Sequence, residues 1–289
     1  MDSTTAPVVP GPKDDGIFGP GSMTWQIETT TACGIGELAS VMIQLLHPRV
    51  MWMIDQSSTF RTDPTLRAQR TAQYLITTAF GDTAAVTRAN ELFNEIHGTL
   101  QGTDPVTGET YYADESDLQA WVHNSKVWGI VHAYQRWGIP ARTPEELDRY
   151  VSEQRIYAKL MHISPETLVP GTVADLEAYM VAMWPKMAFN SATLWFRDFL
   201  LPSSPGITKK SISAWLLGRV LIDLFTPEQR ELLGLRFGPI DHAIGDALAK
   251  RSCKKTAKPY EELLAQKRTE AATHAYGMSF AAKPKPKAE

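Results

Sequence analysis

The feature that most constrains the fold is the repeated pairing of a capping residue with a proline at the first helical position. It occurs at Asp63-Pro64, Thr143-Pro144, Ser164-Pro165 and Thr226-Pro227. A Ser, Thr or Asp side chain accepts a hydrogen bond from a free N–H of the first helical turn, and proline fits there because it has no N–H to satisfy. At Thr143 and Thr226, a Glu or Gln three residues later completes a capping box. These signals predict a chain built mainly from helices.

Apolar residues recur with helical spacing along most of the chain, whereas the alternation typical of strands is almost absent. The expected helices cover residues 36–47, 64–79, 83–97, 115–137, 144–162, 173–184, 187–200, 209–224, 227–234, 240–252 and 259–275. The turn-rich segment from Gly102 to Asp114 could form a small hairpin. We therefore predict an all-α fold with a single multi-helix domain.

The two ends of the chain differ from its body in composition. Residues 1–24 are rich in Pro and Gly, and residues 281–289 alternate Lys with Pro. Such segments bury few large apolar groups, so we expect a flexible N-terminal arm and a disordered C-terminal tail. No linker long enough to mark a boundary interrupts residues 25–280, which we predict to be one domain.

Charge and cysteine usage narrow the function classes. The formal net charge is -3, and no basic stripe lies within the body of the chain, so we expect no nucleic-acid partner. Cys33 and Cys253 lie far apart and form no C-x-x-C pair, which disfavours a disulfide framework or a zinc cluster. This usage is typical of a reducing compartment.

The most apolar segments are too short or too interrupted to span a membrane, which takes roughly 20 apolar residues. His47-Pro48-Arg49 interrupts the first and Pro185-Lys186 interrupts the second. Residues 1–15 lack the charged and apolar regions of a secretory signal. We expect a cytoplasmic protein with at most peripheral membrane contact.

Most of the polar groups with chemical potential lie between Arg67 and His123. Arg67, Arg70 and Thr71 lie in one predicted helix, His97 ends the next, and His123 lies in the largely apolar helix that follows. On its helix, His97 shares a stripe with core-type residues, so it is expected to point inward. An interior excludes such groups unless each has a partner, and a cofactor is one such partner.

An ordered set of short motifs accompanies these residues. They are Gln44-Leu45-Leu46-His47-Pro48, Arg67-x-x-Arg70-Thr71, Phe80-Gly81, Ile96-His97-Gly98, Gly102…Gly108-x-x-Tyr111-x-Ala113-Asp114 and Trp121-Val122-His123. In this order and spacing, from about residue 16 to 250, the chain resembles the bacterial and fungal family of haem-b oxygenases. That family includes the catalytic domain of latex-clearing rubber oxygenases and the fungal oxygenase of mycophenolic acid biosynthesis.

The resemblance implies an all-α fold that encloses one haem b, with His97 as the axial iron ligand. His123 is then a distal acid or base, or a partner of a haem propionate. Arg67 and Arg70 suit the pairing of propionates or the polarisation of bound oxygen or peroxide, because an arginine stays charged and offers several donors. Thr71 is a candidate donor to an iron-bound oxygen.

The chain departs from the rubber-oxygenase branch at one position that matters for chemistry. Arg70 stands where that branch has a lysine able to close the far side of the iron, and no acid lies near Val50 and Met51. The resemblance therefore extends to oxidation of an unidentified apolar or aromatic small molecule by O₂ or H₂O₂, and rubber cleavage is not implied.

Other interpretations of these residues remain open at this point. His97, His123 and a carboxylate could hold a non-haem iron, and the fold could carry or sense haem without turnover. Each residue also has a purely structural explanation, as a buried histidine bonded to backbone or an arginine paired with an acidic residue of another helix. The oligomeric state is left open by the sequence.

Overall fold

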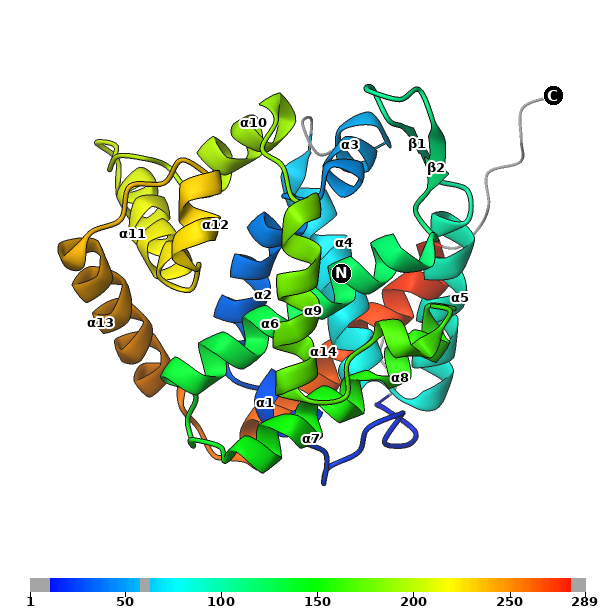
Figure 1. Ribbon diagram of the computed structural model, residues 1–289. Coiled ribbons are helices and arrows are strands. Elements are labelled where there is room, and N and C mark those ends of the chain that lie inside the picture. The colour runs from blue at the N-terminus through cyan, green and yellow to red at the C-terminus, as the bar shows by residue number, and fades with distance from the viewer. Residues whose placement is uncertain (1–10, 58–62, 282–289) are drawn as a thin grey trace, which may run out of the picture.

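Helices make up nearly all of the computed structural model, which describes residues 11–57 and 63–281. The α-helices run along the chain as α1 (Met23–Glu28), α2 (Thr31–Gln44), α3 (Pro48–Ser57), α4 (Pro64–Phe80), α5 (Thr83–His97), α6 (Ser116–Trp137), α7 (Pro144–Gln154), α8 (Ile156–Leu160), α9 (Val173–Met183), α10 (Ser191–Leu200), α11 (Lys209–Asp223), α12 (Pro227–Leu232), α13 (Pro239–Thr256) and α14 (Tyr260–Ala281). The all-α prediction is confirmed (Figure 1).

The cap-and-proline signals mark three helix starts as predicted. The Asp63 side chain accepts from Leu66 N at α4, and capping boxes at Thr143 and Thr226 begin α7 and α12. The prediction at Ser164-Pro165 was wrong, because only a 3-10 turn (Glu166–Leu168) follows and no side chain caps it. The residue that takes the cap position there is Pro165 itself, which has no side-chain oxygen to offer.

The helix α3 was missing from the sequence-based prediction, because Pro48 was taken as an interruption of an apolar segment. In the structure, Pro48 is instead the first residue of α3, the position that proline tolerates best. The short helix α1 was also missing, and the predicted helix over 144–162 is divided at Arg155 into α7 and α8. The expected hairpin is confirmed, with β1 (Gln101–Thr103) antiparallel to β2 (Thr110–Tyr112).

Helix α6 crosses the interior, and its most extensive contact is with α2. The two helices approach closely at Gly36 and Gly129: a Cβ added to Gly36 would lie 2.3 Å from the Gly129 carbonyl oxygen, and one added to Gly129 would lie 2.5 Å from the Gly36 carbonyl oxygen. Since no other residue lacks a Cβ, the pair of glycines sets how near the backbones can come.

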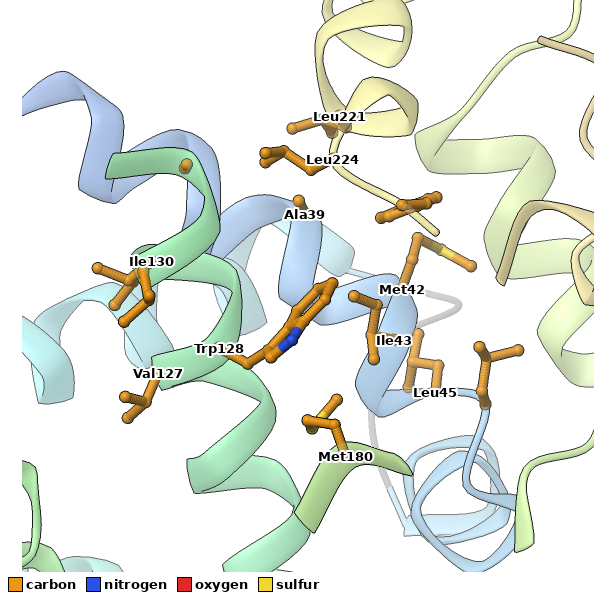
Figure 2. Packing of buried hydrophobic residues seen from close by; sticks show 14 of the residues in the cluster. Ala39, Met42, Ile43, Leu45, Val127, Trp128, Ile130, Met180, Leu221 and Leu224 are labelled. Atoms are coloured by element: carbon orange, nitrogen blue, oxygen red, sulfur yellow. The ribbon is translucent and has the colours of Figure 1, made fainter. Parts of the chain in front are cut away.

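Trp128 on α6 is the centre of the packing between α6 and its neighbours. Figure 2 shows its indole pointing toward Ala39, Met42 and Ile43 of α2, with Met180 of α9 beside it. The indole N–H donates to Glu177 at 3.0 Å, so the one polar atom of the ring is satisfied at the edge of the core. One large apolar cluster joins α2, α6, α9 and α11, as expected for a single domain.

The segment before α1 contacts the helical body where the structure describes it. The Asp14 carboxylate accepts from Thr83 N at 2.8 Å, and Phe18 packs beside Tyr157. The mobility predicted for the chain ends falls largely on residues 1–10 and 282–289, which lie outside the described residues. Both cysteines are free and buried. No described helix is both long enough and apolar enough to cross a membrane.

Candidate functional site

His97 is the last residue of α5, and two local features hold its imidazole. The Asp82 side chain caps the start of this helix, and Gly98 ends it. The His97 ring stacks on Phe93, one turn earlier, with ring centroids 3.8 Å apart. Its Nδ1 lies 2.9 Å from the Phe93 carbonyl oxygen. Because a carbonyl only accepts, Nδ1 donates, and the lone pair of the neutral ring is on Nε2.

Burial keeps this imidazole neutral. Desolvation lowers the pKa of His97, and the positive charge of Arg67 acts in the same direction, against the opposing effect of the Phe93 carbonyl. Within the described residues, Nε2 has no hydrogen-bond partner. A half-buried neutral imidazole with one nitrogen bonded to backbone and the other unpaired is the arrangement that an iron-ligating histidine needs.

The three polar residues predicted on α4 have different environments. Arg67 is half-buried, and desolvation lowers its pKa. Its positive charge also contributes to the lowered pKa of His97. Arg70 and Thr71 lie on the exposed side of the same helix. The Thr71 hydroxyl donates to the Arg67 carbonyl at 3.2 Å, so its hydrogen is used within α4. The structure thus brings Arg67 to His97 and leaves Arg70 and Thr71 toward solvent.

His123 is buried in α6, with 5% of its surface exposed. Desolvation lowers its pKa to about 3, Lys126 adds to the effect, and a hydrogen bond to the Gln154 backbone opposes it. Its Nε2 is buried and has no hydrogen-bond partner among the described residues. A buried polar atom left without a partner is rare in native structures and indicates a missing water, ion or ligand.

A pH profile of unfolding tests the environment of His123. Between its unfolded pKa near 6.5 and its folded pKa of about 3, the unfolded chain binds a proton at this residue and the folded chain does not. Stability contributed by the neutral ring is therefore lost as the pH falls below 6.5, by about 1.4 kcal/mol per pH unit. We expect His123→Gln to remove this slope in urea unfolding measured between pH 6 and 4.

Comparison with a surface variant isolates the effect. Desolvation raises the pKa of Glu37 to about 7, so this residue makes the folded state more stable as the pH falls. Because every variant keeps Glu37, the quantity to measure is the difference in unfolding free energy between each variant and the wild type at each pH. His162 is exposed, and His162→Asn should leave the wild-type profile unchanged. A His123→Gln profile parallel to that of the wild type would contradict the buried neutral imidazole.

No direct contact joins the two imidazoles in the described part of the chain, but a continuous set of side chains connects them through α4. The members are Phe93, Tyr74, Thr78 and Tyr157. Tyr74 stacks on Phe93 at 4.8 Å, and the Tyr157 hydroxyl donates to Thr78 at 3.0 Å. The His123 ring lies 5.1 Å from Tyr157. The helices α4, α5, α6 and α8 thus meet around one aromatic interior.

The structure adds polar residues to this interior that the sequence analysis did not single out. Gln119 lies one turn before His123, and both ends of its amide are buried without a partner among the described residues. Lys126, one turn after His123, lies 4.0 Å from the buried Glu28, which also accepts from Tyr150 at 3.0 Å. One signal in the sequence could have identified these residues: they are polar groups in or beside a helix that is otherwise apolar nearly all round.

Within the described residues, no three His, Cys, Asp or Glu side chains lie close enough together to hold a metal ion. The arrangement instead offers one unpaired imidazole nitrogen at His97 beside a guanidinium, and a second unpaired imidazole nitrogen deep in α6. Such a set could supply one imidazole ligand to an iron that carries other ligands of its own, and a neutral hydrogen-bond acceptor in a dry environment.

Comparison with known proteins agrees with this arrangement. The family model described as ER-bound oxygenase mpaB/B'/Rubber oxygenase, catalytic domain, matches residues 25–251. The match includes α2 to α12 and all of the candidate site residues, from Glu28 to Gln154. Searches among curated proteins and among solved structures found no match.

Proposed function

We propose, because the chain belongs to the family of mpaB/B' and rubber oxygenase catalytic domains, that it is an oxygenase that uses haem b to oxidise an apolar or aromatic small molecule. The family is one of oxygenase catalytic domains, so an oxidoreductase that uses an oxygen-derived oxidant and a small-molecule substrate follows from membership. The identity of the cofactor and the roles of individual residues are our proposal.

One observation carries the choice of haem b, which is the state of His97. Its Nδ1 is bonded to the Phe93 carbonyl and its Nε2 is unpaired in the described structure. Because an imidazole held in this way can bind iron only through Nε2, the ligating nitrogen and the ring orientation are already selected. A porphyrin needs only one such protein ligand, whereas a non-haem iron needs three side chains, and no group of that kind occurs among the described residues.

Arg67 is suited to hold the carboxylate side chains of the porphyrin. It is half-buried, and its guanidinium offers several donors beside His97. Arg70 lies one turn away on the exposed side, where it can bind an anionic group at the mouth of the site. The Thr71 hydroxyl oxygen retains lone pairs that can accept from a ligand, since its hydrogen is donated to Arg67.

His123 is suited to act as a neutral hydrogen-bond acceptor, because burial lowers its pKa to about 3. The Gln154 backbone partly offsets the desolvation of the ring, and Nε2 has no hydrogen-bond partner among the described residues, so it could accept a hydrogen bond from a ligand. Gln119 can hold a polar group of the substrate next to it, because its amide has no other partner within the described chain. Haem b supplies the redox chemistry with O₂ or peroxide. The aromatic side chains of Phe93, Tyr74 and Tyr157 between the two histidines would favour an apolar or aromatic substrate.

The absorption spectrum of the purified protein, with hemin supplied during expression, tests the proposal. We expect a Soret band and about one haem per chain. Oxidation of an apolar or phenolic substrate panel with reductant and O₂, or with peroxide, should follow. A colourless protein would remove haem from the proposal, and a haem protein without turnover would favour a carrier or sensor.

A further inference from the structure

An open cleft is bordered by residues of α6, α11, α12 and α13. Figure 1 shows α11, α12 and α13 at the opposite end of the molecule from α5. The cleft has a volume of about 520 Å³ and is bordered by charged and aromatic side chains. Arg136 belongs to it and lies 13 residues after His123 on α6, which corresponds to about 20 Å along the helix axis. The cleft is therefore separate from the interior around His97 and His123.

The acidic group of the cleft is already neutralised. Asp223 is buried, with 3% of its side chain exposed, and accepts from Arg136 at 2.5 Å and from His242 at 2.7 Å. Arg136 also donates to the Asp223 carbonyl at 2.7 Å. These bonds tie α6, α11 and α13 together and fix the His242 ring as one wall of the cleft. Each oxygen of the Asp223 carboxylate thus already has a cationic or imidazole partner.

Arg230 is a second cation in the cleft, and no carboxylate pairs with it among the described residues. Its guanidinium lies over the Phe237 ring at 5.0 Å, and its Nε contacts the Thr226 carbonyl at 3.4 Å. These contacts orient the group, and no hydrogen bond uses its two terminal nitrogens among the described residues. Arg136 is paired with Asp223 and also lies 3.8 Å from Asp246, which Lys250 contacts in turn. Arg230 is therefore the arginine of the cleft lining that has no carboxylate partner among the described residues.

We propose that this cleft is a binding site for a small organic anion that has a carboxylate head and a flat aromatic body. The oriented guanidinium of Arg230 matches a carboxylate through two parallel hydrogen bonds. The rings of Phe237, Pro239 and His242 provide flat walls against which an aromatic body can pack. A volume of about 520 Å³ falls within the usual range for small-molecule sites.

Ligand-observed NMR titration of the full-length protein with benzoate, acetate and benzamide tests this site. We expect benzoate to bind saturably and about tenfold more tightly than acetate, which lacks the ring, or benzamide, which lacks the charge. Arg230→Gln should weaken benzoate binding about tenfold, and Arg230→Lys should weaken it less, because lysine keeps the charge but not the planar fork. The readout is binding alone, so it does not depend on haem or on turnover.

The matched control is Arg236→Gln, in the loop that follows α12, which is exposed and outside the cleft. It should bind benzoate as the wild type does, and circular dichroism melting establishes that each variant is folded. The proposal is overturned if benzoate does not saturate, if acetate or benzamide binds equally well, or if the Arg230 and Arg236 variants behave alike.

Discussion

His97→Asn is expected to reduce the haem content of the purified protein to less than about one tenth of the wild-type value, because the iron loses its protein ligand. The change should perturb folding little, since His97 ends α5 and Asn is tolerated at helix ends. The measurement is the ratio of Soret absorbance to protein absorbance after expression with hemin. Loss of the band should be accompanied by loss of any oxidation activity.

His162→Asn provides the matched control. His162 is exposed in a loop, and its own φ of 56° lies in a region that Asn adopts readily. Its haem content should equal that of the wild type. Equal haem content in both variants would show that another residue binds the iron. Addition of imidazole to His97→Asn offers a second test: recovery of the band would indicate that the porphyrin pocket is intact and that only the ligand was missing.

Gly36→Ala is expected to destabilise the protein by about 3 kcal/mol, near the upper end for an added methyl group in a packed interior. The new Cβ would lie 2.3 Å from the Gly129 carbonyl oxygen and 2.6 Å from the Ile130 Cα, so α2 and α6 would have to separate. Backbone atoms of a helix cannot move aside as a flexible side chain can. The free energy of unfolding by urea, measured by circular dichroism, gives the size of the effect.

Gly34→Ala on the same helix is the control. Gly34 is exposed, and a Cβ there meets no atom within 4 Å. Alanine is the better helix former by up to about 1 kcal/mol, so this variant should be unchanged or slightly more stable. A loss of stability of the same size in both variants would contradict the close approach of α2 and α6 as the cause.

Local signals were reliable where a helix start depends on a few neighbouring residues. The caps at Asp63, Thr143 and Thr226 formed as predicted, because each needs only a side-chain oxygen and a proline within one turn. The start of α3 at Pro48 was missed, because the apolar run before this proline led us to interpret it as an interruption of that run. The position of His97 at the end of α5 followed from a different local signal, Gly98, which ends the helix.

Exposure within the predicted site was less predictable. The helical stripe that places His97 toward the interior also contains Ile96, which the structure leaves 45% exposed. On α4, Arg67 and Thr71 share a helical face by spacing, yet Arg67 is half-buried and Thr71 is exposed. Spacing determines which residues share a face, whereas the neighbours that cover each part of that face come from other helices.

The amino-acid sequence alone determined the helical class, most helix starts, the hairpin and the oxygenase family, because these depend on short-range hydrogen bonding, residue spacing and ordered motifs. Only the tertiary structure decided which polar groups meet. It brought Lys126 to Glu28, left Nε2 of His123 buried without a partner among the described residues, and gathered Asp223 and Arg230 at one cleft. Lys126 and Glu28 lie 98 positions apart in the sequence, so their contact depends on how the helices pack and not on any local pattern.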